Sequence, residues 1–327
     1  MKALYLSESG GNLGYVFGPE QRARIGRLLG FEPVEATALP EDCSEVEMIF
    51  STWGMPALSK EEIEQKLPRL RHVFYAAGSV QYFARPFLEA GVHVYSAWQA
   101  NAVPVVQFAF SQILLACKGY FQVQAACKES RAGAQALFKN YPGVYDVKIG
   151  ILGCGAIGSE VCRMLVREGL EVLAYDPYMS EERAAQLGVR KAEMDEIFRE
   201  CIVVSNHIPN LPSTVGVIKR EHLLSLQEYA TFINTGRGPQ LCEQDLYDAL
   251  VQTPTRTALL DVMTDEQLSD DKPITKLPNC FLTPHIAGSA GNEVHRMADY
   301  MADMLGRVLA GQEAEYEVTL KMLETMA

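Results

Sequence analysis

The sequence predicts an α/β protein with two doubly wound domains, each a mainly parallel sheet covered by helices. Short apolar runs alternate with amphipathic helical segments along most of the chain, which is typical of repeated strand–helix–strand units. A glycine-rich turn between a strand and a helix begins at Gly153 rather than near the N-terminus. We therefore expect a Rossmann domain, residues 102–289, to be inserted into a smaller flavodoxin-like domain formed by residues 1–101 and 290–327.

The composition is that of a globular protein and argues against several classes of function. The 327 residues are 48% hydrophobic and 21% charged, and a formal net charge of -12 disfavours nucleic acid or an anionic membrane as a partner. The eight cysteines include no C-x-x-C pair, so we expect neither a disulfide framework nor a metal site. The apolar run after Met1 is too short for a signal peptide, which favours the cytoplasm.

Helix signals are clear in the N-terminal part of the chain. Ser59 and Glu62 form a capping-box pattern that opens a helix, and Gly30 is placed to end a helix over Pro19–Leu29. Apolar runs between the helical segments predict four buried strands: Lys2–Leu6, Met48–Ser51, Val73–Ala76 and Val92–Tyr95.

The segment Ala102–Cys117 is apolar for almost the length of a membrane span. Gln107 and Ser111 interrupt it, and it is shorter than the roughly 20 residues that a span requires. We expect a helix that is buried in a core or in a subunit interface. Beyond Ser289 the pattern predicts one long amphipathic helix that returns to the first domain.

The alternation of strands and helices resumes after Val147. Apolar runs predict six strands, the number that a complete dinucleotide-binding fold uses: Lys148–Leu152, Glu171–Tyr175, Ile202–Ser205, Thr231–Asn234, Ala258–Val262 and Cys280–Leu282.

The turn after the first of these strands has the G-x-G-x-x-G order of a dinucleotide site. Gly153 permits a tight turn, Gly155 leaves room for a pyrophosphate, and Gly158 lets the helix pack closely on the strand. The free N–H groups at the start of the helix favour a diphosphate. Asp176 ends the next strand, where a carboxylate accepts hydrogen bonds from ribose hydroxyls and repels a 2′-phosphate. NAD is therefore favoured over NADP.

Polar segments follow four later strands: Asn206–Pro209, Asn234–Gly238, Asp261–Glu266 and Thr283–Gly288. Together with the glycine turn they give the order G-x-G-x-x-G, D, H-x-P, N-x-x-R-G, D-V-x-x-x-E and T-P-H-x-x-G. This order resembles the D-isomer-specific 2-hydroxyacid dehydrogenase family, which includes phosphoglycerate, glycerate, D-lactate and formate dehydrogenases. The resemblance covers nearly the whole chain. It implies an NAD-dependent oxidoreductase that interconverts a small D-2-hydroxy acid and its 2-keto acid.

The resemblance also implies a catalytic trio. Arg237 would bind the substrate carboxylate and polarise the carbonyl, His285 would donate or accept the proton, and Glu266 would orient the imidazole. The chemistry fits, because a guanidinium can bind a carboxylate through two parallel hydrogen bonds and histidine titrates near neutrality. His207 also ends a strand beside a proline and is the alternative acid/base, although the family pattern puts it under the nicotinamide.

Further contacts follow from the same resemblance. We expect cofactor contacts from Gly153, Gly155, Ala156, Ile157, Gly158, Asp176, His207, Pro209, Thr235, Gly236, Asp261 and Gly288. In the smaller, substrate-binding domain, the loop with Gly78 and Ser79 would offer N–H groups to the substrate carboxylate. Trp53 is either a wall of the substrate pocket or a packed core residue. A homodimer formed through the 102–117 helix is also expected.

Two segments depart from the common family pattern and leave the substrate undetermined. Many members have two glycines and an acidic residue or Asn where this chain has Ser79–Tyr82, and many have Val-Asp within the segment Pro239–Cys242. A formate dehydrogenase gains no support from Ser79–Tyr82. An NAD(H)-sensing, corepressor-like interaction protein stays open because such relatives retain the trio, but the lack of a basic patch counts against it.

Overall fold

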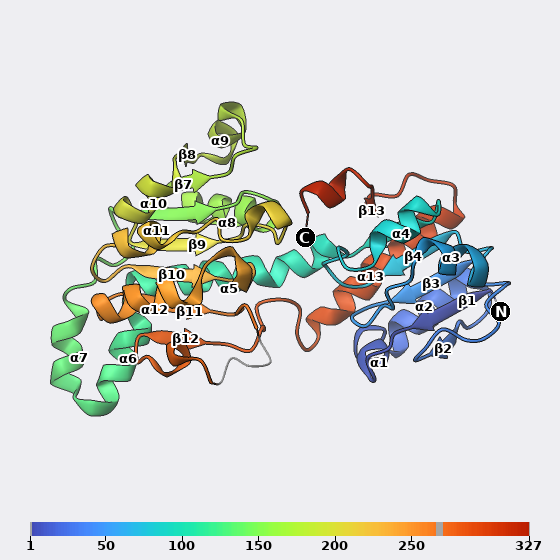
Figure 1. Ribbon diagram of the computed structural model, residues 1–327, viewed down its shortest axis with the longest axis horizontal. Helices are drawn as coiled ribbons and strands as arrows, with labels where there is room; N and C mark the ends of the chain where they lie inside the picture. Colours follow the sequence, from blue (N-terminus) through green and yellow to red (C-terminus); the bar gives the residue numbers. More distant parts are fainter. Residues whose placement is uncertain (1, 266–270, 327) are drawn as a thin grey trace. The chain divides into compact units, whose positions relative to one another are not determined.

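The structure, a computed structural model, describes residues 2–265 and 271–326. The chain folds into two compact units, Met1–Ala102 with Ser289–Ala327 and Val103–Gly288, and each unit contains one sheet with helices on both faces (Figure 1). The prediction of an α/β protein with two doubly wound sheets is confirmed. We describe each unit by itself.

The sheet of the first unit has the strand order β13-β5-β4-β3-β1-β2. Read from the other edge, its parallel strands have the 2-1-3-4-5 order of flavodoxin-like folds, and only β13 is antiparallel to its neighbour β5. The six strands are β1 (Ala3–Leu6), β2 (Val34–Ala36), β3 (Met48–Ser51), β4 (His72–Tyr75), β5 (His93–Ser96) and β13 (Glu317–Val318).

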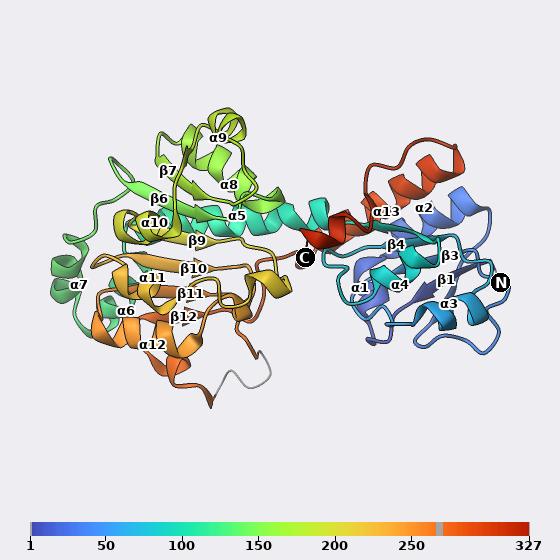
Figure 2. The same cartoon turned by 45° about the horizontal axis from the view of Figure 1, so that its top comes forward.

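Alternating side chains of these strands form two cores, one on each face of the sheet. Leu4 and Leu6 of β1 belong to the core under α3 and α4, whereas Tyr5 belongs to the core under α2 and α13. Figure 2 shows α13 and α2 side by side. The helices of this unit are α1 (Asn12–Val16), α2 (Pro19–Leu29), α3 (Lys60–Lys66), α4 (Ala84–Glu89) and α13 (Glu293–Leu309), with a 3-10 turn, η5, at Met322–Glu324.

The helix ends in this unit follow the capping residues. Ser59 and Glu62 exchange the two hydrogen bonds of a capping box, at 3.2 and 3.0 Å, so α3 begins at Lys60 as predicted. Gly30 has φ 77°, a left-handed conformation that ends α2 at Leu29.

The sheet of the second unit has seven parallel strands in the order β12-β11-β10-β9-β6-β7-β8. This is the 3-2-1-4-5-6 order of a dinucleotide-binding fold with β12 added at one edge. The strands are β6 (Lys148–Leu152), β7 (Glu171–Tyr175), β8 (Arg190–Lys191), β9 (Val203–Asn206), β10 (Thr231–Asn234), β11 (Thr257–Leu260) and β12 (Cys280–Leu282). The six predicted strands are all present, and the sheet has one strand more because the two-residue strand β8 was not predicted.

Helices cover both faces of this sheet (Figures 1 and 2). One core contains residues of α5, α8 and α9, and the other contains residues of α10, α11 and α12. The helices are α5 (Trp98–Cys117), α6 (Tyr120–Glu129), α7 (Arg131–Phe138), α8 (Ala156–Arg167), α9 (Glu181–Leu187), α10 (Met194–Glu200), α11 (Arg220–Ser225) and α12 (Glu243–Gln252), with 3-10 turns η1 (Pro212–Thr214), η2 (Gly238–Gln240) and η4 (Pro273–Lys276).

Helix α5 begins at Trp98, earlier than predicted, and is 20 residues long. Among the described residues it is the one helix that is long and apolar enough to cross a membrane, by length and composition only. Half of the most apolar stretch of this helix is buried inside the protein. Ala109 and Ile113 are fully buried against the sheet of the second unit. The core of this unit therefore accounts for the buried face of α5 from Val106 to Cys117, whereas Ala100 belongs to a core of the first unit.

Candidate active site at the carboxyl ends of the second sheet

The carboxyl ends of β6, β9, β10, β11 and β12 lie in a row along one edge of the second sheet. The strand order changes direction between β6 and β9, which is the switch point where doubly wound folds bind their ligands. The predicted site residues of this unit that the structure describes lie in the loops that follow these strands or β7, or in the first turn of α8.

The glycine turn after β6 has the geometry that a diphosphate requires. Gly153 has φ 84°, and a Cβ there would lie 2.9 Å from the backbone of His207. A Cβ on Gly158 would collide with the carbonyl oxygen of Gly153, so only glycine allows α8 to pack so closely. At Gly155, in contrast, nothing lies within 4 Å of the Cβ position, which leaves open space beside the turn.

The start of helix α8 offers unused N–H groups to that space. The first helical hydrogen bond runs from the N–H of Ser159 to the carbonyl of Gly155. The N–H groups of Ala156 and Ile157 therefore have no carbonyl partner within the helix. These groups and the positive end of the helix dipole fit a bound diphosphate.

Asp176 lies at the end of β7 and is hydrogen-bonded to the glycine turn. Its Oδ2 accepts from the N–H of Cys154 at 2.8 Å and its Oδ1 from the N–H of Tyr178 at 2.9 Å. The side chain stays partly exposed, and each carboxylate oxygen has a second lone pair for a ribose hydroxyl. The residues of the turn, α8 and Asp176 therefore fit a nicotinamide dinucleotide without a 2′-phosphate.

His207 follows β9 and lies between two hydroxyl groups. Its Nε2 is 3.0 Å from Ser205 Oγ and its Nδ1 is 3.3 Å from Thr235 Oγ1. Burial lowers the pKa of His207 from 6.5 to about 4, so the ring is neutral at physiological pH. A neutral ring with both nitrogens engaged is a poor proton donor, which favours a structural or cofactor-facing role for His207.

Arg237 follows β10, and its backbone is held on both sides. Its N–H donates to Gln240 Oε1 at 3.2 Å, and its carbonyl accepts from Asn234 Nδ2 at 3.0 Å. The guanidinium donates through Nη1 to the carbonyl of Gly236 at 2.8 Å and is half-buried. The loop packs against the loop after β11, because a Cβ on Gly238 would collide with the backbone of Met263 and Thr264.

His285 follows β12 and is exposed, with a left-handed backbone at φ 55°. Its N–H lies 3.0 Å from the carbonyls of both Asp261 and Thr283. A left-handed conformation is uncommon for residues other than glycine and is held here by the surrounding contacts.

The carboxylate of Asp261 holds the loop that carries His285. Asp261 is 3% exposed. Its Oδ1 accepts from Thr283 Oγ1 at 2.6 Å and from the N–H of Ile286 at 2.8 Å, and its Oδ2 accepts from the N–H of Ala287 at 2.9 Å. The expected contact of Asp261 with the cofactor stays a prediction, and the structure adds this second role.

Glu266, the residue expected to orient the imidazole, lies outside the described residues. Glu243, the first residue of α12, contacts the chain on both sides of residues 266–270. Its Oε1 accepts from the N–H of Thr264 at 2.7 Å, and its Oε2 lies 2.6 Å from Lys272 Nζ.

In the first unit, the loop after β4 carries Gly78 and Ser79, whose expected contact with the substrate stays a prediction. Within residues 2–265 and 271–326, no oxygen accepts from the N–H groups of Gly78 and Ser79, whereas the carbonyl of Gly78 accepts from Ser96 Oγ at 2.8 Å. Trp53 is half-buried and packs against both cores of this unit, which supports the packed-core alternative for its side chain.

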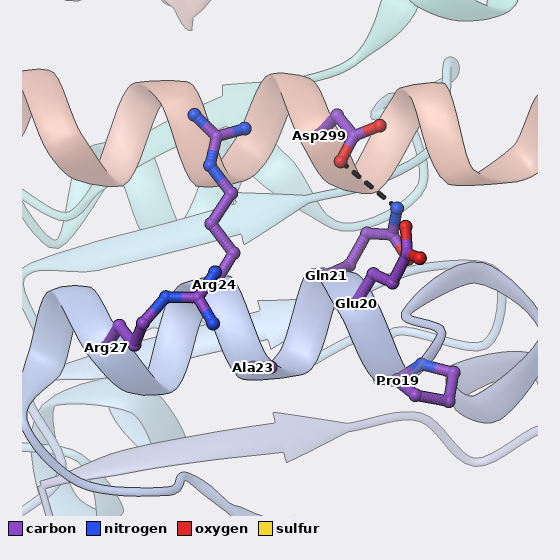
Figure 3. A pocket seen from close by; sticks show the side chains of 7 residues that line it. All are labelled: Pro19, Glu20, Gln21, Ala23, Arg24, Arg27 and Asp299. Carbon is purple, nitrogen blue, oxygen red and sulfur yellow. Dashed lines mark hydrogen bonds between the residues drawn. The ribbon is translucent and has the colours of Figure 1, made fainter.

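A hollow in the described part of the first unit lies away from the predicted site residues, between α2 and α13. It measures about 530 Å³ and is shown in Figure 3. In its lining, Gln21 Nε2 donates to Asp299 Oδ1 at 3.1 Å, and Arg24 is paired with Asp303. None of the predicted site residues lines this hollow, so its size alone does not make it the active site.

Sequence reasoning did not identify the role of three polar side chains in organising the strand-end loops. Gln240 and Glu243 were not singled out, and Asp261 was expected only beside the cofactor. The polar residue Gln240 between Pro239 and Leu241 can be noticed in the sequence. Its hydrogen-bond partners, however, come from a distant loop, so its role could not be predicted.

The chain matches the family described as D-isomer specific 2-hydroxyacid dehydrogenase, NAD binding domain, over residues 110–287, which is more than half of its length. It is 27% identical over 292 residues to a hydroxypyruvate reductase of Blautia hydrogenotrophica, with 88% of this chain and 90% of the relative covered. It is 29% identical over 230 residues to a D-3-phosphoglycerate dehydrogenase of Synechocystis, with 70% of this chain but only 41% of the relative covered.

Solved structures with the same fold include D-2-hydroxyisocaproate dehydrogenase. The TM-score is 0.77 at 18% identity, with 98% of this chain and 100% of that chain covered. At this level of identity the similarity concerns the fold.

Proposed function

The chain belongs to the D-isomer specific 2-hydroxyacid dehydrogenase family and is an NAD-dependent oxidoreductase, and on this premise we propose that it reduces a small 2-keto acid to the D-2-hydroxy acid. The reverse oxidation uses the same groups. The name of the hydroxypyruvate reductase relative, 90% of which is covered, suggests a keto acid of about three carbons.

In this proposal, NAD(H) supplies or takes up the hydride, and the chain supplies binding, orientation and the proton. The N–H groups at the start of α8 bind the diphosphate, and Asp176 binds the adenosine ribose. Gly155 leaves the space that the diphosphate needs. The remaining contacts expected from Pro209, Thr235, Gly236 and Gly288 belong to the same proposal.

Arg237 binds the substrate carboxylate and polarises the carbonyl oxygen, and His285 donates the proton to that oxygen during reduction. Glu266 holds the imidazole through its other nitrogen. The N–H groups of Gly78 and Ser79 in the first unit complete the proposed set, whereas Trp53, expected as either a pocket wall or a core residue, packs against the cores of that unit. Positioned acid–base groups of this kind typically contribute about 10²–10⁴ in rate.

One observation carries the proposal. The loops after β10, β11 and β12 are joined to one another, since Gly238 packs on the backbone of Met263 and the N–H of His285 donates to the carbonyl of Asp261. A guanidinium after β10 and an imidazole after β12, the two strands that flank β11, therefore lie at the same end of the sheet as the glycine turn after β6.

The experiment is turnover of NADH with hydroxypyruvate, glyoxylate and pyruvate, followed by analysis of the product's chirality. We expect measurable turnover of at least one of these acids and a D product. The alternative, an NAD(H)-sensing interaction protein, gains no support from the comparisons. It would be favoured by nanomolar NADH binding without turnover of any acid.

We also propose a homodimer that uses the second unit. The exposed stripe of α5 contains Gln107, Ser111 and Leu115. Helix α6 has no buried residue, and large apolar side chains such as Phe138 of α7 are exposed nearby in sequence. A dimer formed through α5 would cover exposed apolar side chains such as Leu115 and Phe138. A monomer in light scattering at micromolar concentration would refute this part of the proposal.

A further inference from the structure

The side chain of Gln240 is fully buried and uses its whole hydrogen-bonding capacity. Its Oε1 accepts from Asn206 Nδ2 at 2.6 Å and from the N–H of Arg237 at 3.2 Å. Its Nε2 donates to the carbonyls of Ile208 and Pro209, the latter at 3.1 Å. An amide has two N–H donors and two acceptor lone pairs, so no capacity is left.

The orientation of this amide is determined by its partners. The two carbonyls can only accept, and the N–H of Arg237 can only donate. A flipped amide would place donor against donor and acceptor against acceptor. Gln240 therefore joins the loop after β9 to the loop after β10 in one arrangement.

Two asparagines extend the network to the other side of Arg237. Asn206 Nδ2 also donates to Asn234 Oδ1 at 3.0 Å. Asn234 in turn accepts from the N–H of Gly236 at 3.0 Å and donates to the carbonyl of Arg237 at 3.0 Å. Both peptide groups that flank the Cα of Arg237 are thus hydrogen-bonded to buried amide side chains.

Packing leaves this loop little room for another conformation. A Cβ on Gly236 would lie 3.0 Å from Gln240 Oε1 and 3.1 Å from Asn206 Nδ2. An apolar residue in place of Gln240 would leave the N–H of Arg237 and two carbonyls without their partners. The loop would then have to move to satisfy them.

We propose that Gln240 is a positioning residue for substrate binding, which acts by fixing the backbone from which the Arg237 guanidinium extends. This inference rests on the proposed role of Arg237 as the carboxylate-binding group. If Gln240 were only structural, replacing it would lower the stability of the fold and affect substrate and cofactor binding alike. If it positions Arg237, replacing it weakens substrate binding and leaves NADH binding nearly unchanged.

The test measures the dissociation constant of oxamate, an unreactive carboxylate analogue of a 2-keto acid, in the presence of saturating NADH. In Gln240→Leu we expect oxamate to bind at least tenfold more weakly, while the dissociation constant of NADH changes less than threefold. The matched control is Gln244→Leu. Gln244 lies exposed on α12 and donates to Asp248 Oδ1 at 2.8 Å, away from the Gln240 network, so neither constant should change.

Gln240→Glu provides a second variant of nearly the same shape. An ionised carboxylate keeps the acceptor but loses both donors, whereas a protonated one regains a donor for Ile208 or Pro209. Relative to the unmodified protein at each pH, oxamate affinity should recover as the pH falls from 8 to 6. If Gln240→Leu does not fold, this variant carries the test.

A double-mutant cycle with Arg237→Ala separates the inference from the proposed function. If Gln240 acts through Arg237, Gln240→Leu weakens oxamate binding less than twofold further in the Arg237→Ala background. Full additivity of the two effects, or equal weakening of NADH and oxamate, overturns the positioning role. If Arg237→Ala itself leaves oxamate binding unchanged, it is the proposed role of Arg237 that fails.

Discussion

The loop that carries His285 offers a direct test, through the variant Asp261→Asn. The buried carboxylate of Asp261 accepts from Thr283 Oγ1 and from the N–H groups of Ile286 and Ala287, at 2.6, 2.8 and 2.9 Å. Hydrogen bonds to a charged acceptor contribute about 1.5–3 kcal/mol each. An amide keeps the acceptor of one side but turns a donor toward the other, so at least one of these bonds is lost.

The free energy lost with one of these hydrogen bonds is comparable with the backbone strain at His285 that the Asp261 carboxylate counteracts. A left-handed backbone at a residue other than glycine costs about 1–3 kcal/mol. Without the full anchor, His285 can relax from its φ of 55° and carry the imidazole away from the substrate. Because about 1.4 kcal/mol corresponds to a tenfold change in rate, we expect a kcat roughly 10- to 100-fold lower.

The assay is NADH oxidation with the best keto acid from the panel, together with NADH binding and thermal unfolding. Asp303→Asn on the surface of α13 is the control and should behave as the unmodified protein. An unchanged kcat for Asp261→Asn would refute the anchoring argument. Weaker NADH binding at unchanged kcat would instead support the cofactor contact that the sequence suggests for Asp261.

Three further predictions concern the neighbouring strand ends. His285→Ala should lower kcat by about 10²–10⁴ with NADH affinity nearly unchanged, measured by steady-state kinetics and NADH titration, and full activity would reassign the proton donor to His207. Asp176→Ala should weaken NADH binding and narrow the preference for NAD over NADP, whereas equal use of both cofactors by the unmodified protein would contradict the assigned role. Burial lowers the pKa of His207 to about 4, below the value of about 6.5 in the unfolded chain, so its contribution to stability is complete above about pH 6.5 and is lost as the pH falls toward 4. His207→Gln should therefore show a smaller fall in melting temperature between pH 7 and pH 4.5, and an equal fall would count against the buried neutral ring.

Local signals predicted those parts of the fold that depend on neighbouring residues. Ser59 and Gly30 determine the ends of α3 and α2 through contacts within one turn, and such contacts can be read from a few letters. Strand β8 has only two residues, Arg190–Lys191, and carries no apolar signal. The edge strand β2 is similarly short and largely exposed, so hydrophobic patterning did not reveal it.

The candidate site was predictable where residue type implies chemistry and less so where distant residues combine. Gly153 and Asp176 have spacings that identify a dinucleotide turn. The hydrogen bonds of Gln240 to Ile208 and Pro209, in contrast, span about thirty residues and depend on β9 lying beside β10. The backbone conformation of His285 depends likewise on Asp261, a residue of the preceding strand end.

The two contacts of Glu243 have an evolutionary consequence. One carboxylate holds Thr264 and Lys272, so the chain enters and leaves residues 266–270 at anchored points. Extra residues inserted between Thr264 and Lys272 would add only a small loop-closure entropy, about 0.6 kcal/mol for each doubling of length. Insertions can therefore arise here between homologues without unravelling the sheet, provided that they keep Glu266, which the proposed function places on the imidazole of His285.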